Sequence, residues 1–133
     1  GARAAFMLKG DQPPADRRAG WHLTSRQLRA MCEQPLPTRP LPAERWLSAS
    51  CHDAEELQMA ERLGVDFAVL SPLLPTASHP EANPLGWEQA HAMLNNCRLP
   101  VYLLGGLTGE DLASAHNAGA QGIAAIRGLW KLP

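Results

Sequence analysis

Residues with reactive side chains follow several short apolar runs of this 133-residue chain. The fullest set is Ser50, Cys51 and His52, which lies between the run "RWLSA" and an acidic segment that starts at Asp53. An imidazole beside the start of a helix stays neutral near pH 7, because the positive end of the helix dipole disfavours the cation, and it can then move a proton. The alternative role for His52 is to fill the turn before the helix. Cys51 points the opposite way along an extended backbone, so we expect it in the core.

A glycine pair, Gly105-Gly106, follows the run "VYLL" and precedes Thr108. Two glycines before a capped helix leave backbone amides directed outward, which is how a helix N-terminus receives phosphate. A plain tight turn is the alternative. Arg127 follows the last apolar run, and in α/β barrels a phosphate is commonly held by the loops after the last two strands. These two loops together predict a phosphate site.

Hydroxyl and imidazole groups also gather in a proline-bounded loop at Thr76, Ser78 and His79, and His22 ends a further apolar run. Loops rich in hydroxyls are common for turn chemistry alone, so ligand binding and turn formation are both open for this loop. The sequence has no HExxH motif and no Cys/His cluster with the spacing of metal ligands.

These residues are positioned by alternating strand-like and helix-like segments. The strand-like runs are apolar on both alternating faces, which is typical of parallel strands buried on two sides. Parallel strands end at one edge, so the residues that follow them share one mouth. We therefore predict an α/β fold with about six parallel strands. Strands are expected within 4–11, 19–24, 44–50, 65–72, 100–106 and 121–128, and helices within 24–33, 53–64, 86–96 and 108–119.

Helix boundaries are marked by capping residues. The expected N-cap pairs are Thr24 with Gln27, Asp53 with Glu56 and Thr108 with Asp111, and the expected C-terminal stops are Gly64 and Gly119. Each helix has one apolar stripe to place on the sheet, and in the last helix the stripe is Leu112, Ala115 and Ala118.

Composition restricts the function classes. The chain has 12 basic and 13 acidic residues and no basic block, which disfavours nucleic acid and membrane partners. No apolar run approaches the length of a membrane span. Three cysteines without CxxC spacing favour reduced thiols and a cytoplasmic protein. The length suits one domain, residues 1–133.

Four segments together resemble thiamine phosphate synthase and its relative TenI, the thiazole tautomerase. They are "GWHLTSRQL", "SASCHDAEELQMAERLGVDFAVLSPLLPTASHP", "PVYLLGGL" and "AGAQGIAAIRGLW", and the resemblance runs from about residue 4 to the end. It implies a TIM (β/α) barrel, of which this chain holds strands three to eight, so that the domain is truncated. The forms that these motifs take here, "TSRQL", "SCHDAEEL" and "LSPLLPTASHP", look closest to the synthase-like domain that is fused behind a Nudix hydrolase in some bacterial proteins. Six strands leave two open sheet edges, so a homodimer is expected.

The resemblance also implies roles for individual residues. Ser50 matches a serine near the pyrophosphate, His52 matches the acid/base of the tautomerase, and His79 stands where the synthases have a lysine. Thr76 and Ser78 match hydroxyls that bind the thiazole phosphate and the pyrophosphate, Gly106 matches a glycine whose amide binds the thiazole phosphate, and Ile126 and Arg127 match the final phosphate loop.

Magnesium is a further implied ligand, and here the sequence departs from the family. The asparagine-aspartate pair of the family falls on Lys9-Gly10, and the second magnesium aspartate falls on Gln27. Asp11 is the remaining candidate ligand, although a hard dication prefers several oxygen ligands.

Three functional hypotheses follow. The first is a domain that binds a thiazole phosphate or a related small phosphorylated ligand, with His52 and Ser50 as catalytic residues of a proton shift that needs no magnesium. The second is a catalytically degenerate domain that regulates or supports a Nudix nucleotide hydrolase. The third is a phosphosugar-binding barrel of another pathway.

Overall fold

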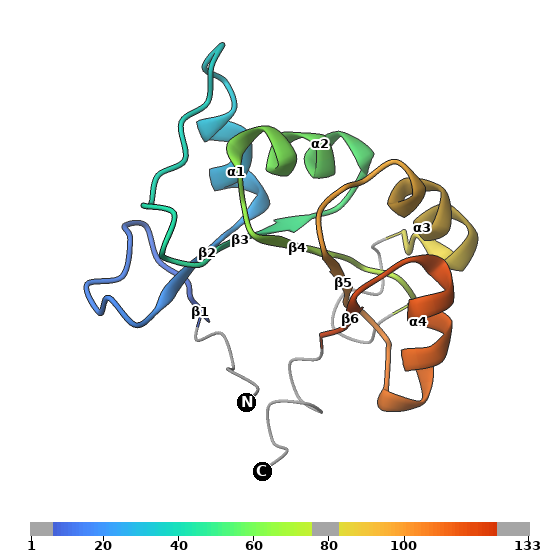
Figure 1. Cartoon of the computed structure of the whole chain (residues 1–133). Helices are drawn as coiled ribbons and strands as arrows, with labels where there is room; N and C mark the ends of the chain where they lie inside the picture. The colour runs from blue at the N-terminus through green and yellow to red at the C-terminus, as the bar shows by residue number, and fades with distance from the viewer. Residues whose placement is uncertain (1–6, 76–82, 125–133) are drawn as a thin grey trace.

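The computed structural model describes residues 7–75 and 83–124 (Figure 1). Within them, six strands form one sheet in the order β1-β2-β3-β4-β5-β6, and every neighbouring pair is parallel. This confirms the predicted α/β class with six parallel strands. The strands are β1 (Met7–Leu8), β2 (Gly20–Leu23), β3 (Leu47–Cys51), β4 (Phe67–Leu70), β5 (Val101–Leu103) and β6 (Gly122–Ile123).

A helix follows each strand from β2 to β5, whereas β1 and β2 are joined without one, and several helix ends follow the capping residues of the sequence. The Thr24 side chain accepts from the Gln27 amide in a capping box, and the Asp53 side chain accepts from the Glu56 amide. Gly64 ends its helix in the left-handed conformation. The helices are α1 (Ser25–Met31), α2 (Ala54–Leu63), α3 (Gly86–Asn95) and α4 (Leu112–Ala118), with a 3-10 turn η1 (Gly109–Asp111) before α4.

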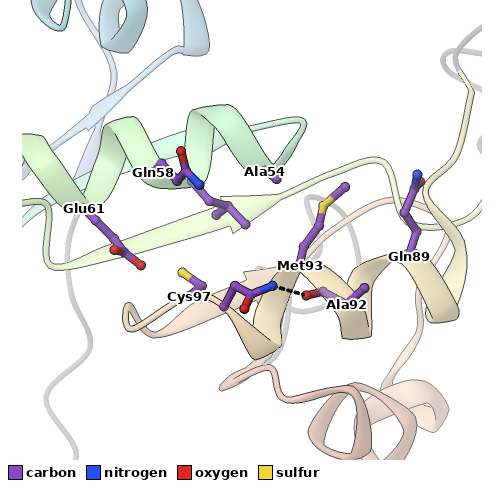
Figure 2. Close-up of a pocket in the computed structure, with 9 residues that line it drawn as sticks. Ala54, Gln58, Glu61, Gln89, Ala92, Met93 and Cys97 are labelled. Atoms are coloured by element: carbon purple, nitrogen blue, oxygen red, sulfur yellow. Dashed lines mark hydrogen bonds between the residues drawn. The ribbon is translucent and has the colours of Figure 1, made fainter.

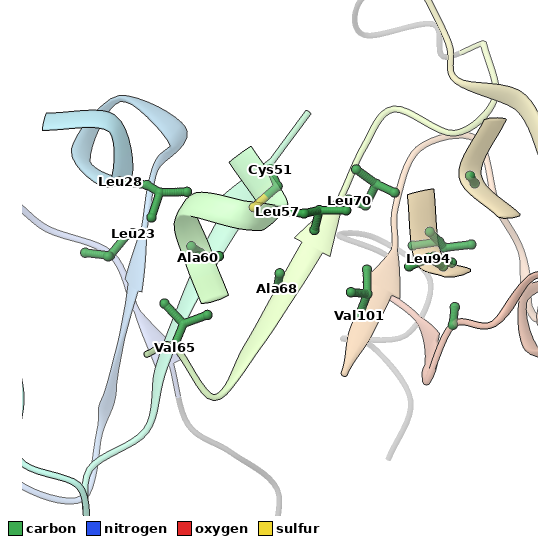
Figure 3. Close-up of a cluster of buried hydrophobic side chains, with 14 of the residues drawn as sticks. Leu23, Leu28, Cys51, Leu57, Ala60, Val65, Ala68, Leu70, Leu94 and Val101 are labelled. Atoms are coloured by element: carbon green, nitrogen blue, oxygen red, sulfur yellow. The ribbon is translucent and has the colours of Figure 1, made fainter. Parts of the chain in front are cut away.

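The two faces of the sheet differ. The described helices lie together on one face of a curved sheet (Figure 1). Alternate strand residues point to that face and form the core with the helix stripes; Leu57 and Ala60 of α2 pack with Cys51 of β3 and Ala68 of β4 (Figure 3). On the opposite face, the ring centroids of Phe67 and Tyr102 are 5.5 Å apart.

The predicted stripe of the last helix is wrong at one position. Ala115 and Ala118 are buried, whereas Leu112 is 41% exposed. All three residues lie in α4, where positions three apart differ by about 60° around the helix axis. Leu112 is therefore offset by about 120° from Ala118, and it lies in the first turn of the helix at the exposed edge of the stripe.

None of the described helices is long and apolar enough to cross a bilayer.

Candidate functional site

The loops after β3, β4 and β5 lie against one another at the carboxyl edge of the sheet. The amide of Ser71, just after β4, donates to the Cys51 carbonyl at the end of β3. The amides of Leu73 and Leu74 donate to the carbonyls of Leu104 and Gly105, just after β5. The common mouth that the parallel strands predict is therefore present for these three loops.

His52 lies at this edge with a defined ring orientation. Its Nδ1 is 2.9 Å from the Ser71 carbonyl oxygen, which can only accept. In the neutral ring the proton is therefore on Nδ1, and Nε2 carries the free lone pair. The side chain is exposed. His52 thus offers an accessible basic nitrogen, as the acid/base hypothesis requires.

The backbone of His52 is fixed by a buried carboxylate. Glu56 of α2 is 3% exposed and accepts from the His52 amide at 2.7 Å. Its second oxygen accepts from Nε of Arg29 on α1. The helix pair thereby holds the loop that carries His52.

The glycine pair forms a turn that only glycine fits. Both residues have positive φ, 109° at Gly105 and 68° at Gly106. A Cβ on Gly105 would lie 2.8 Å from Cα of Pro72, and one on Gly106 would lie 2.7 Å from the Pro75 carbonyl oxygen. Within the described residues, the amides of Gly105, Gly106 and Leu107 donate to no carbonyl. The turn therefore packs closely on the loop after β4, and among the described residues its amides have no acceptor.

A histidine and two serines form a network that the sequence did not predict. His22 of β2 has Nδ1 2.6 Å from Oγ of Ser48 and Nε2 2.7 Å from Oγ of Ser50, both on β3. Burial, and to a smaller extent the charge of Lys9, lowers the pKa of His22 to about 4. The sequence placed His22 at a strand end without a role. The signal was the alternation in "LSAS", which puts two serines on the face that His22 shares.

Cys51 belongs to the core, as predicted. Its side chain is fully buried on the helix-facing side of β3. Burial is the main cause that raises the pKa of its thiol to about 12, so the reactive thiolate is absent at neutral pH.

Several predicted site residues lie outside the described residues. They are Thr76, Ser78, His79, Ile126 and Arg127. Their roles stay predictions.

Asp11 is described, and its surroundings fit magnesium poorly. It is exposed beside Lys9 and Gly10, and the Gly10 carbonyl already accepts from Nε1 of Trp21 and Nε2 of Gln27. Within residues 7–75 and 83–124, no three potential metal ligands gather. One carboxylate beside a lysine is a weak donor set for a hard dication.

A separate cavity of about 330 Å³ lies between α2 and α3 (Figure 2). Gln58 and Glu61 of α2 face Met93 of α3 and Cys97 across it. It is in the helix layer, and none of the predicted site residues lines it. The carboxyl edge of the sheet therefore remains the candidate site.

The family model that matches this chain, and two curated relatives of it, carry the name of thiamine phosphate synthase. A family model described as thiamine monophosphate synthase matches residues 15–129. A provisionally named thiamine-phosphate synthase of Geobacter sulfurreducens is 30% identical over 130 residues, covering 97% of this chain and 59% of that protein. A provisionally named thiamine-phosphate synthase 2 of Aquifex aeolicus is 43% identical over 77 residues, covering 58% of this chain and 41% of that protein. The chain thus spans about two fifths to three fifths of the length of these relatives.

A solved structure shares the fold. Thiamine phosphate pyrophosphorylase from Pyrococcus furiosus superposes with a TM-score of 0.56 at 17% identity, covering 92% of this chain and 71% of that one. This confirms the predicted TIM-barrel type of fold, of which six parallel strands are described here.

Proposed function

Because the chain belongs to the thiamine monophosphate synthase family, we propose that it binds a thiazole phosphate or a related phosphorylated ligand at the carboxyl edge of its sheet. The observation that carries the proposal is the contact between the loops after β3, β4 and β5. It brings to the same edge the His52 imidazole and the glycine turn, and within residues 7–75 and 83–124 neither Nε2 of His52 nor the amides of Gly105 and Gly106 have a hydrogen-bond partner. Amides at such a turn suit phosphate oxygens.

A proton shift is the chemistry that the His52 geometry supports. Nε2 takes a proton from a carbon of the bound ligand and returns it to a different atom, so that the ligand changes its tautomer and no electrons leave it. While Nε2 holds the proton, the Ser71 carbonyl oxygen continues to accept from Nδ1–H and stabilises the cation. His52 therefore ends the cycle in the form in which it began.

Magnesium takes no part in this proposal. The donor set at Asp11 does not fit the ion, so no step is routed through it.

Calorimetric titration of the chain with thiazole phosphate tests binding. We expect Gly106→Ala to abolish binding, because the new Cβ meets the Pro75 carbonyl, and the turn must open. Gly109→Ala is the matched control, since a Cβ there has nothing within 4 Å. Binding by Gly106→Ala equal to wild type would contradict the site.

Exchange of ligand carbon-bound protons with deuterium tests the acid/base role. We expect exchange with the wild type and a loss of at least tenfold in His52→Gln, with binding retained. His116→Gln removes an exposed imidazole of α4 and is the control. Unchanged exchange in His52→Gln would show that this imidazole is not the base.

A second candidate is a domain without chemistry of its own that regulates or supports an attached Nudix hydrolase. The poor metal donor set at Asp11 favours it, because a synthase reaction depends on stabilising a departing pyrophosphate. Nudix turnover measured with and without this domain separates the candidates. If Nudix turnover is the same with and without this domain, and the domain binds thiazole phosphate, the ligand-binding function is favoured over the regulatory one.

A further inference from the structure

The network of His22, Ser48 and Ser50 has no part in the proposed proton shift. The imidazole lies between the two hydroxyls at 2.6 and 2.7 Å, so both of its nitrogens are engaged. His22 and Ser48 are register partners on neighbouring parallel strands, so the sheet itself sets their separation. Such a fixed ring determines which hydroxyl protons remain free.

The proton count leaves two arrangements. A neutral imidazole has one N–H, so it donates to one serine and accepts from the other. In the first arrangement, Nδ1–H donates to Ser48 and Ser50 donates to Nε2. In the second, Ser48 donates to Nδ1 and Nε2–H donates to Ser50. The first makes Ser50 an activated nucleophile, and the second makes it a free donor.

The burial of Ser48 separates the two arrangements. Its side chain has no exposed surface, and the structure gives its Oγ no partner except His22 within the described ranges 7–75 and 83–124. The first arrangement would leave the Ser48 proton buried without an acceptor, which disfavours it roughly tenfold. In the second, the free proton belongs to Ser50, which is partly exposed at the end of β3.

We infer that His22 is a positioning residue that is anchored by Ser48, donates from Nε2 to Ser50 and leaves the Ser50 hydroxyl proton to a ligand oxygen. The inference rests on the proposed function, because it concerns the phosphorylated ligand at the same edge of the sheet. The family resemblance already implies a serine near the pyrophosphate at this position, and a phosphate or pyrophosphate oxygen is an acceptor that suits the donor; the orientation of that serine by His22 and Ser48 is what the structure adds. Ser50 is thereby a binding group and a poor nucleophile, since its oxygen accepts from the imidazole and has no base to take its proton.

The tautomer of His22 tests the arrangement without a ligand. In long-range nitrogen–proton NMR spectra of the wild-type chain, we expect a protonated, pyrrole-type Nε2 and a pyridine-type Nδ1. Ser48→Ala removes the anchor and is expected to give a mixture of the two tautomers, whereas Ser114→Ala on α4 leaves the spectrum unchanged. A protonated Nδ1 in the wild type, or reaction of Ser50 with a fluorophosphonate, would overturn the inference.

Titration with inorganic pyrophosphate tests the donor role. We expect Ser50→Ala to weaken binding roughly tenfold and Ser48→Ala roughly threefold, with Ser114→Ala equal to wild type. Wild-type affinity in Ser50→Ala would overturn the donor role, while binding of thiazole phosphate would still support the proposed function. Failure of the wild type to bind either probe would contradict the proposed function, and the tautomer would still decide the role of His22.

Discussion

Acidification should destabilise this protein through His22. The folded-state pKa is about 4, against an ordinary value of 6.5, because burial disfavours the imidazolium. Above pH 6.5 the group is neutral in both the folded and the unfolded chain and adds no pH dependence. Between pH 6.5 and pH 4 the unfolded chain takes up a proton that the folded chain refuses, so stability falls. Below pH 4 both states are protonated and this loss stops.

The shift corresponds to about 3 kcal/mol of unfolding free energy, since one pKa unit is worth about 1.36 kcal/mol. Urea unfolding, followed by tryptophan fluorescence at a series of pH values, measures it. His22→Gln removes the titrating group, so the variant should lose less stability than the wild type as the pH falls to 4. The difference between the two free energies should change by about 3 kcal/mol across the interval.

The control for this experiment is His116→Gln, which measures what the loss of an exposed imidazole outside the network does by itself. If the wild type and His22→Gln lose the same amount of stability between neutral pH and pH 4, the reasoning is refuted. Such a result would mean that the folded protein accepts the proton on His22 as readily as the unfolded chain does.

Three further predictions concern stability and assembly. Gly106→Ala should lower the free energy of unfolding by roughly 1–3 kcal/mol, from its positive φ and its close backbone neighbour, whereas Gly109→Ala should be nearly neutral in the same urea series; equal losses would contradict this account of the turn. Glu56→Ala should cost roughly 2–4 kcal/mol, because it leaves the His52 amide without its acceptor and takes from Arg29 its buried partner, so that only the more exposed Asp53 and Glu55 remain beside the guanidinium; exposed Glu55→Ala should cost far less. Among the described residues, β1 and β6 are the outermost strands of the sheet, and their unpaired edges predict a homodimer; sedimentation velocity that finds only monomer at every concentration would contradict it.

The sequence predicted the elements of this fold well, because local signals mark them. Capping side chains at Thr24 and Asp53 and the left-handed glycine at Gly64 act within a few residues of the helix ends. The strands were recognised because their runs are short and largely apolar, although β3 carries Ser48 and Ser50 on the face that points away from the helices. Leu112 was misplaced because a spacing of three residues drifts around an α-helix, so the first position of the stripe lies at its edge.

The candidate site was predictable only in part. Strand-end positions placed His52 and Gly106 at one edge, since parallel strands share their direction. The link between His22 and Ser48 was not predictable, because it depends on the register between β2 and β3, and a shift of one residue would turn one side chain to the other face. The tautomer of His52 likewise depends on a carbonyl that follows a different strand.

Each strand of this sheet lies beside the strand that precedes it along the chain. A ribosome that releases the polypeptide at roughly 5–20 residues per second therefore exposes every strand next to a neighbour that has already emerged. The sheet can grow from its amino-terminal side during translation, and no strand has to wait for a distant partner.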